Sequence, residues 1–174
     1  MNERLDVNAV VEDSRLGAFQ VLVLLQCFLC MVVDGFDVQA MAYAAPALIQ
    51  QWGIDKASLG PVFSCSLLGM LIGSLTFGSI ADRLGRRPVL IGAAFSLSLL
   101  MYATRYATTV EQLVLLRLLT GLAMGAIVPN VAALATEYAP MRNRIMLLML
   151  VSSGLVAGGI IGGAAAAALI PAHG

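Results

Sequence analysis

Long stretches without charged residues set the pattern of hydrophobic and polar positions along this chain. Residues 57–81 and 145–172 carry no charge, and 88–104 and 118–136 form shorter uncharged stretches. The first apolar stretch, 18–49, is interrupted by two aspartates. A helix needs about 20 mostly apolar residues to cross a membrane. The pattern therefore predicts five transmembrane helices, which we place at 18–49, 58–80, 88–107, 112–136 and 145–170.

The segments between these predicted helices are short, and helices joined by short connections are usually antiparallel neighbours. We therefore expect a chain that runs up and down across the membrane. Residues 1–17 are polar and of mixed charge, whereas a secretory signal has a basic start and an apolar core of about 7–15 residues. We interpret residues 1–17 as a cytoplasmic tail.

The amino-acid composition excludes an ordinary soluble domain. Of 174 residues, 60% are hydrophobic and 11% are charged, against roughly a quarter charged in soluble domains. Such a chain has too few polar side chains to cover a soluble core. We therefore expect an all-α membrane protein surrounded by the lipid bilayer. The formal net charge of zero gives no indication of a nucleic-acid partner.

Basic residues are distributed unevenly between the two ends of the predicted helices. Only Lys56 and Arg105 fall on one side. The seven on the other side are Arg4, Arg15, Arg83, Arg86, Arg87, Arg142 and Arg144. Lysine and arginine gather on the cytoplasmic side of membrane proteins. We therefore predict a multi-pass protein of the cell inner membrane with a cytoplasmic N-terminus.

Glycines recur every fourth position in three of the predicted helices, a spacing that allows helix backbones to approach closely in lipid. We expect these glycines to form helix-packing faces. They are Gly69 and Gly73, Gly121 and Gly125, and Gly154, Gly158 and Gly162, with Gly159 and Gly163 beside the last set.

Two aspartates lie inside the first predicted helix. Asp34 and Asp37 are three residues apart, so they lie on nearly the same face of that helix. A charged side chain at mid-membrane costs at least about 2.5–3.5 kcal/mol, so the pair needs a cavity or a partner. One interpretation is a structural ion pair or polar network, and the other is a site for a proton or a substrate. Burial and mutual repulsion disfavour the charged form of a carboxyl, which suits a group that binds and releases protons.

Arg117 is the matching cation. It lies six residues after Glu111, about 9 Å into the fourth predicted helix. A guanidinium keeps its charge and binds carboxylates through two hydrogen bonds. Arg117 is therefore expected either to pair with Asp34 or Asp37, or to hold a substrate carboxylate. Asp37 lies nearer than Asp34 to the outer side, from which Arg117 enters, so Asp37 is the favoured partner.

The segment between the second and third predicted helices is dense in polar and glycine positions. It reads G-S-I-A-D-R-L-G-R-R-P from Gly78 to Pro88. This segment resembles the loop signature of the major facilitator superfamily, in which a glycine is followed by D-R-x-G-R-R. The resemblance implies a conformational-switch role for Gly78, Asp82, Arg83, Gly85, Arg86 and Arg87.

Two further segments resemble the same superfamily. Arg117, with Gly121 and Gly125, is similar to its fourth-helix motif. The stretch Asp34-Gly-Phe-Asp37 resembles the signature of the aromatic acid:H⁺ symporter branch, whose members move 4-hydroxybenzoate, benzoate and related acids. The resemblance implies that Asp34, Asp37, Asp82 and Arg117 matter for transport. Because Asp34, Asp37 and Arg117 are the ionisable residues buried inside the predicted spans, we predict that they bind substrate and protons. The resemblance also implies a loop element after the fourth helix that consists of Glu137, Arg142 and Arg144.

The resemblance also implies the overall architecture. Transporters of this superfamily have two halves of six helices, with the substrate site near the midplane between them. On this basis, residues 18–174 form an incomplete N-terminal transmembrane half, with five of its six helices, and the partner C-terminal half is missing.

The sequence therefore predicts part of a secondary active transporter that takes up an aromatic carboxylate, such as 4-hydroxybenzoate, together with protons. Two alternatives stay open: a major facilitator porter for another organic acid or a sugar, and a truncated fragment that does not transport. No nucleophile–base pair, metal-ligand cluster or phosphate-binding glycine loop indicates an enzyme, a metal site or a cofactor. Cys27 and Cys30 lie in an apolar stretch and are interpreted as packing residues.

Overall fold

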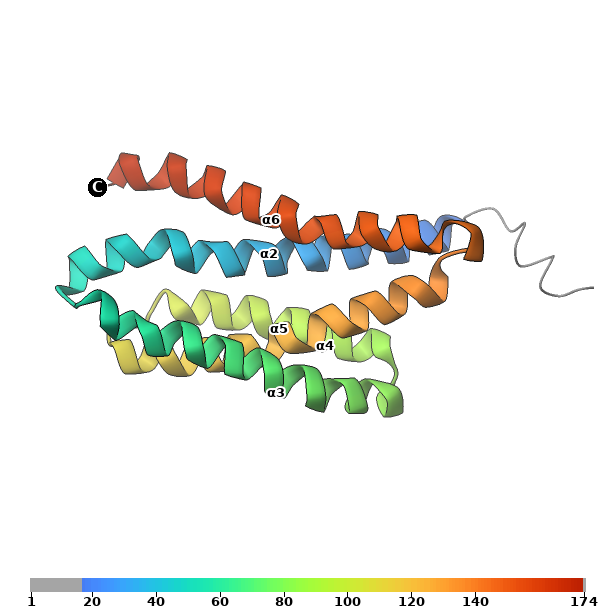
Figure 1. Cartoon of the computed structure of the whole chain (residues 1–174), viewed down its shortest axis with the longest axis horizontal. Helices are drawn as coiled ribbons and strands as arrows, with labels where there is room; N and C mark the ends of the chain where they lie inside the picture. Colours follow the sequence, from blue (N-terminus) through green and yellow to red (C-terminus); the bar gives the residue numbers. More distant parts are fainter. Residues whose placement is uncertain (1–16, 174) are drawn as a thin grey trace, which may run out of the picture.

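The structure, a computed structural model, describes residues 17–173 and their side chains up to residue 168. It contains long helices joined by short connections, two of which include 3₁₀ turns (Figure 1). The elements in chain order are α2 (Ala18–Trp52), η1 (Lys56–Leu59), α3 (Gly60–Leu84), α4 (Arg86–Thr104), α5 (Val110–Tyr138), η2 (Met141–Asn143) and α6 (Arg144–His173).

Five helices in the described part of the chain are long and apolar enough to cross a membrane. The predicted all-α membrane fold with five spans is therefore confirmed. Residues 1–16 of the expected cytoplasmic tail lie outside the described residues, so their interpretation stays a prediction.

Several helix ends differ from the predicted positions, and local chemistry explains some of these differences. The helix placed at 88–107 is α4, which begins at Arg86 and ends at Thr104. Tyr106 N–H instead donates to the Ala103 carbonyl in a tighter turn. The next helix begins at Val110 rather than at 112, because the Thr109 hydroxyl accepts a hydrogen bond from the Gln112 backbone N–H at 3.3 Å and so caps the first turn.

Glycines with positive φ set two other helix ends. Helix α2 continues past the expected residue 49 to Trp52 and ends where Gly53 adopts φ 62°. Helix α3 starts two residues later than expected, after η1, and continues to Leu84 until Gly85 adopts φ 93°. Other residues rarely take such values. Apolarity alone therefore located the spans but not these ends, which glycine backbone geometry determines.

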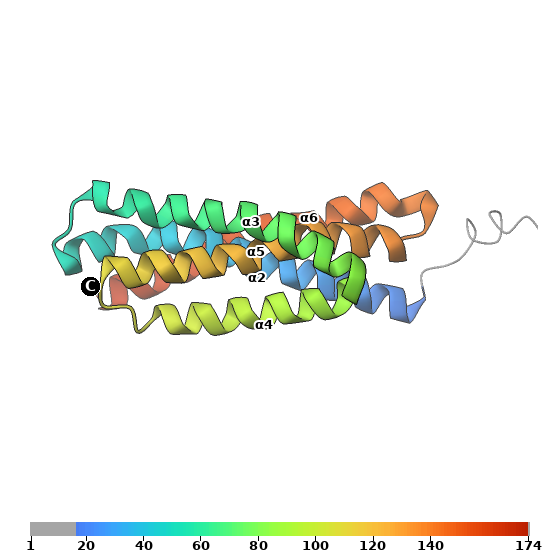
Figure 2. The same cartoon turned by 90° about the horizontal axis from the view of Figure 1, so that it is seen from below.

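The helices associate mainly as two pairs. Helix α2 lies along α6, α3 lies along α5, and α4 packs against α5 on another side. Figures 1 and 2 show that the start of α2, the α3–α4 turn and the α5–α6 connection lie at one end of the bundle. Successive helices are therefore antiparallel, as expected from the short connections.

Glycines bring both helix pairs close together. A Cβ atom added to Gly125 would lie 2.7 Å from the Ser74 backbone nitrogen of α3. One added to Gly158 would lie 2.8 Å from the Phe36 backbone nitrogen of α2. Both distances are shorter than real Cβ contacts allow, so only glycine permits this backbone approach.

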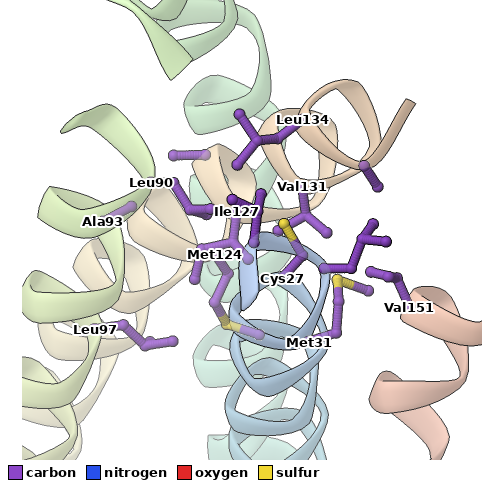
Figure 3. Close-up of a cluster of buried hydrophobic side chains, with 14 of the residues drawn as sticks. Cys27, Met31, Leu90, Ala93, Leu97, Met124, Ile127, Val131, Leu134 and Val151 are labelled. Carbon is purple, nitrogen blue, oxygen red and sulfur yellow. The ribbon is translucent and has the colours of Figure 1, made fainter. Parts of the chain in front are cut away.

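The main apolar core joins α2, α4, α5 and α6 at the end of the bundle where α2 begins (Figure 3). Met124 and Ile127 of α5 are each 1% exposed, and Cys27 of α2 is fully buried beside them. Large apolar side chains also lie on the outside, as in a helix that faces lipid. On α3 these include Leu67, Leu68, Leu71, Ile72 and Leu75.

Candidate functional site

A buried ion pair connects the middle of α2 to α5. The Nη1 atom of Arg117 donates to both carboxylate oxygens of Asp37, at 3.1 Å to Oδ1 and 2.9 Å to Oδ2. Asp37 is 2% exposed and Arg117 is 7% exposed. The sequence left both Asp34 and Asp37 open as partners of Arg117, and the structure pairs Arg117 with Asp37.

Asp34 lies one turn away on the same helix and is only 1% exposed. Its Oδ1 atom is buried and has no hydrogen-bond partner within the described residues. The Nε atom of Arg117 is likewise buried and unpartnered there. Leaving a buried polar group unsatisfied costs about 1–3 kcal/mol. The site therefore retains one acceptor and one donor that a proton or a small polar ligand could satisfy.

Asp37 and Arg117 line a cavity of about 570 Å³ between α2, α4 and α5. This volume lies within the range of roughly 300–1,000 Å³ that is common for small-molecule sites. Apolar side chains, including Met41 and Leu113, form much of its wall. Its other polar lining residues lie toward the C-terminal end of α2 and are Gln51, Thr104, Arg105 and Thr108. The cavity thus combines apolar walls with the Asp37–Arg117 ion pair, and an apolar anion could bind there by competing with Asp37 for the guanidinium.

The segment between α3 and α4 forms a second polar group, at the opposite end of the bundle. Gly85 makes the turn with φ 93°. Arg86, the first residue of α4, lies 3.7 Å from Asp82 of α3 and 3.1 Å from Glu137 of α5. Three helices therefore meet at one guanidinium, and the side chains of all three residues are partly exposed.

The remaining residues of the two predicted loop elements are less closely connected. Arg83, Arg87 and Arg142 are exposed. Gly78 has open space where a Cβ atom would point. Among the ion pairs of the described residues, Glu137 joins Arg86 and has no pair with Arg142 or Arg144. The sequence had grouped Glu137 with those two arginines, and it carried no signal for the contact with Arg86, which depends on how α4 and α5 pack.

Two buried polar residues of α5 were not singled out from the sequence. Thr120 and Asn130 are 0% and 3% exposed, but both donate to carbonyls of their own helix, of Arg117 and Ala126 respectively. Their polar groups are satisfied locally. The described residues contain no group of three or more histidine, cysteine or acidic side chains placed to hold a metal ion.

Comparisons with known proteins agree with the geometry of a membrane bundle. Residues 27–174 match the family model described as Major Facilitator Superfamily. The chain is 47% identical over 172 residues to a 4-hydroxybenzoate transporter of Pseudomonas aeruginosa, which covers 99% of this chain and 38% of that protein. It is 44% identical over 170 residues to a gallate transporter of Pseudomonas putida, which covers 98% of this chain and 38% of that protein.

A more distant relative is the benzoate transport protein of Acinetobacter baylyi. It is 32% identical over 179 aligned positions, which cover 100% of this chain and 38% of that protein. The chain thus spans about 38% of the length of these relatives.

Proposed function

Because this chain belongs to the major facilitator superfamily, we propose that it is part of a secondary active transporter for the uptake of an aromatic carboxylate, such as 4-hydroxybenzoate, together with protons. The names of its relatives support an aromatic acid as substrate. They also agree with the resemblance of Asp34-Gly-Phe-Asp37 to the aromatic acid:H⁺ symporter branch. Transport would require the further helices that a second half contributes.

The observation that carries this proposal is the buried pair of Asp37 and Arg117 at the deep end of the cavity, with Asp34 one turn away. Arg117 has a buried N–H without a partner among the described residues and a charge that one carboxylate, that of Asp37, now balances. An incoming substrate carboxylate can therefore bind the guanidinium and compete with Asp37 for it.

Proton coupling follows from this competition. Inside a membrane, a carboxylate without a cation partner is costly. Displacement of Asp37 from Arg117 therefore favours uptake of a proton by the aspartate pair. We assign Asp34 as the deeper proton site, because it has no cation partner among the described residues. Return of Asp37 to Arg117 would then accompany release of the substrate.

We assign the cluster of charged residues Asp82, Arg86 and Glu137 to conformational switching. Asp82, Arg86 and Glu137 join α3, α4 and α5 at the end of the bundle away from the cavity mouth. We place this end in the cytoplasm, at the inner membrane, because the basic loop residues collect there. The remaining switch-loop residues are Gly78, Arg83, Gly85 and Arg87, with Arg142 and Arg144 in the neighbouring connection.

The experiment is uptake by a chimera in which this chain replaces the matching segment of the Pseudomonas aeruginosa relative. Membrane vesicles with an imposed pH gradient, acidic outside, should accumulate labelled 4-hydroxybenzoate, and a protonophore should abolish the accumulation. Accumulation of another organic acid or a sugar in its place would favour the alternative porter. If the chimera is inserted in the membrane but transports no solute, the chain is a non-transporting fragment.

A further inference from the structure

Gln39 and Tyr43 form a second polar feature on α2, on the side that faces α6. Both side chains are exposed, and 39% of the surface of Tyr43 is accessible. Gln39 lies four residues beyond the central residue of the 35-residue helix α2, or about 6 Å along its axis. Within the described residues, neither side chain makes a hydrogen bond to another group. The sequence could have indicated this feature, because Gln39 is a polar residue inside an apolar span.

Two glycines of α6 make room for these side chains. A Cβ atom on Gly159 would lie 3.1 Å from Cγ of Gln39, and one on Gly163 would lie 2.9 Å from the Tyr43 hydroxyl. By contrast, Gly158 and Gly35 accommodate the backbone of the opposite helix. Gly159 and Gly163 therefore belong to the α2–α6 packing face, but they lie against two polar side chains of α2 instead of its backbone.

Gln39, Tyr43 and Gly159 line a cleft of about 380 Å³ between α2 and α6, whose other lining residues include Val38, Leu155 and Ile160. An amide and a phenol that faced lipid hydrocarbon would leave their polar groups unsatisfied. Polar residues within spans instead face water-filled cavities or polar partners. We therefore expect this cleft, with its apolar walls and uncharged pair of hydrogen-bonding groups, to face solute.

We propose that Gln39 and Tyr43 bind the ring hydroxyl of a hydroxylated aromatic acid and so select among aromatic acids. This inference rests on the proposed function. The apolar walls fit an aromatic ring, while the Gln39 amide and the Tyr43 hydroxyl can each donate to or accept from a phenol. Among the described residues, no charged side chain lines this cleft, so they offer no partner there for the carboxylate.

This site is separate from the ion pair. Asp37 and Gln39 are two residues apart, so at about 100° per residue they leave α2 on opposite sides. A solute of benzoate size cannot reach Arg117 and Gln39 together around the helix. The cleft is thus a second contact on the transport path, used by hydroxylated acids and not required by benzoate. The higher identity to the 4-hydroxybenzoate and gallate transporters than to the benzoate protein favours a hydroxyl-reading site in this chain.

The first test compares initial uptake rates of labelled 4-hydroxybenzoate and benzoate in the chimera described above. Gln39→Leu removes the amide and Tyr43→Phe removes only the hydroxyl. Each should lower the ratio of the 4-hydroxybenzoate rate to the benzoate rate about five- to tenfold, as expected for one lost hydrogen bond. The benzoate rate itself should change less than about twofold. The matched controls are Gln26→Leu, also exposed on α2, and Tyr102→Phe, an exposed tyrosine of α4. An unchanged ratio, or equal loss of both activities, would overturn the proposal.

A second measurement does not depend on transport. Cysteine replaces Val156, an exposed residue that lines the same cleft, after Cys27, Cys30 and Cys65 are replaced by alanine, so that Gln39 and Tyr43 stay in place. A hydrophilic maleimide should label this cysteine, and 4-hydroxybenzoate should slow the labelling more than benzoate does. Lack of labelling, or equal protection by both acids, would contradict a hydroxyl-binding cleft. If the chimera transports neither acid but selective protection is seen, the proposed function fails and the binding site stands.

Discussion

The guanidinium of Arg86 lies 3.1 Å from the carboxylate of Glu137, which joins the first residue of α4 to the last turn of α5. Asp82, one turn before the Gly85 corner, lies 3.7 Å from the same guanidinium. The Arg86 guanidinium therefore joins three consecutive helices, α3, α4 and α5, at one end of the bundle. Because these side chains are partly exposed, the contact can break and form again at low cost.

We predict that reversing either charge of this contact slows transport without weakening substrate binding. In the chimera, Arg86→Glu and Glu137→Arg should each lower the maximal uptake rate and leave KM nearly unchanged, because the contact is far from the cavity. The double exchange should recover part of the rate. Stability should fall by less than about 1 kcal/mol, as is typical of exposed pairs. A large rise in KM with normal protein levels would contradict the assignment to switching.

The buried pair should behave differently. Arg117→Ala leaves the carboxylate of Asp37 without its cation and should destabilise the bundle by about 3–5 kcal/mol. Adding Asp37→Ala should restore part of that loss, because no uncompensated charge is then buried. Denaturation of the purified chain in mild detergent, followed by circular dichroism, measures both effects. Simple addition of the two single losses would show that the residues are not energetically coupled.

Removal of the deeper carboxyl should uncouple transport from the proton gradient. Asp34→Asn retains the shape of the side chain but cannot bind and release a proton. We expect exchange of labelled 4-hydroxybenzoate to continue while accumulation driven by an imposed pH gradient is lost. Asp37→Asn is the companion variant. If both variants still accumulate substrate against its gradient, neither aspartate carries the proton.

Alanine at one glycine of the α3–α5 contact should be far more harmful than alanine at an open glycine. Gly125→Ala would place a methyl group 3.0 Å from the Gly73 Cα atom and should cost about 1–3 kcal/mol by overpacking. Gly92→Ala on α4 meets no atom within 4 Å and should stabilise its helix by about 0.5–1 kcal/mol. Unfolding of both variants in mixed micelles gives the comparison, and equal stabilities would contradict the close contact.

The predicted orientation can be tested with single cysteines in a background without the native thiols. Lys56→Cys, near the start of α3, should react with an impermeant maleimide added to intact spheroplasts. Leu84→Cys, at the other end of the same helix, should react only after the membrane is opened, because the basic end is expected to face the cytoplasm. The reverse pattern of labelling would invert the topology.

The spans were predictable because lipid imposes one dominant requirement, a continuous apolar stretch, and the sequence records it directly. The partner of Arg117 could also be favoured from the sequence, since depth along two antiparallel helices limits the choice to Asp34 or Asp37. The contact of Arg86 with Glu137 could not, because it depends on the lateral packing of α4 against α5. Likewise, the glycine spacing of α6 did not distinguish Gly158, beneath a backbone, from Gly159, beneath the side chain of Gln39.

The order of the helices has a consequence for synthesis of the protein. Asp37 and its partner in α5 are 80 residues apart, and ribosomes add about 5–20 residues per second, so the aspartate precedes the arginine by roughly 4–16 s. Throughout that interval nascent α2 carries two carboxyls and lacks the cation that neutralises one of them. We therefore expect stable integration of the first span to depend on the emergence of the fourth, with α2 either protonated or in contact with water until α5 arrives.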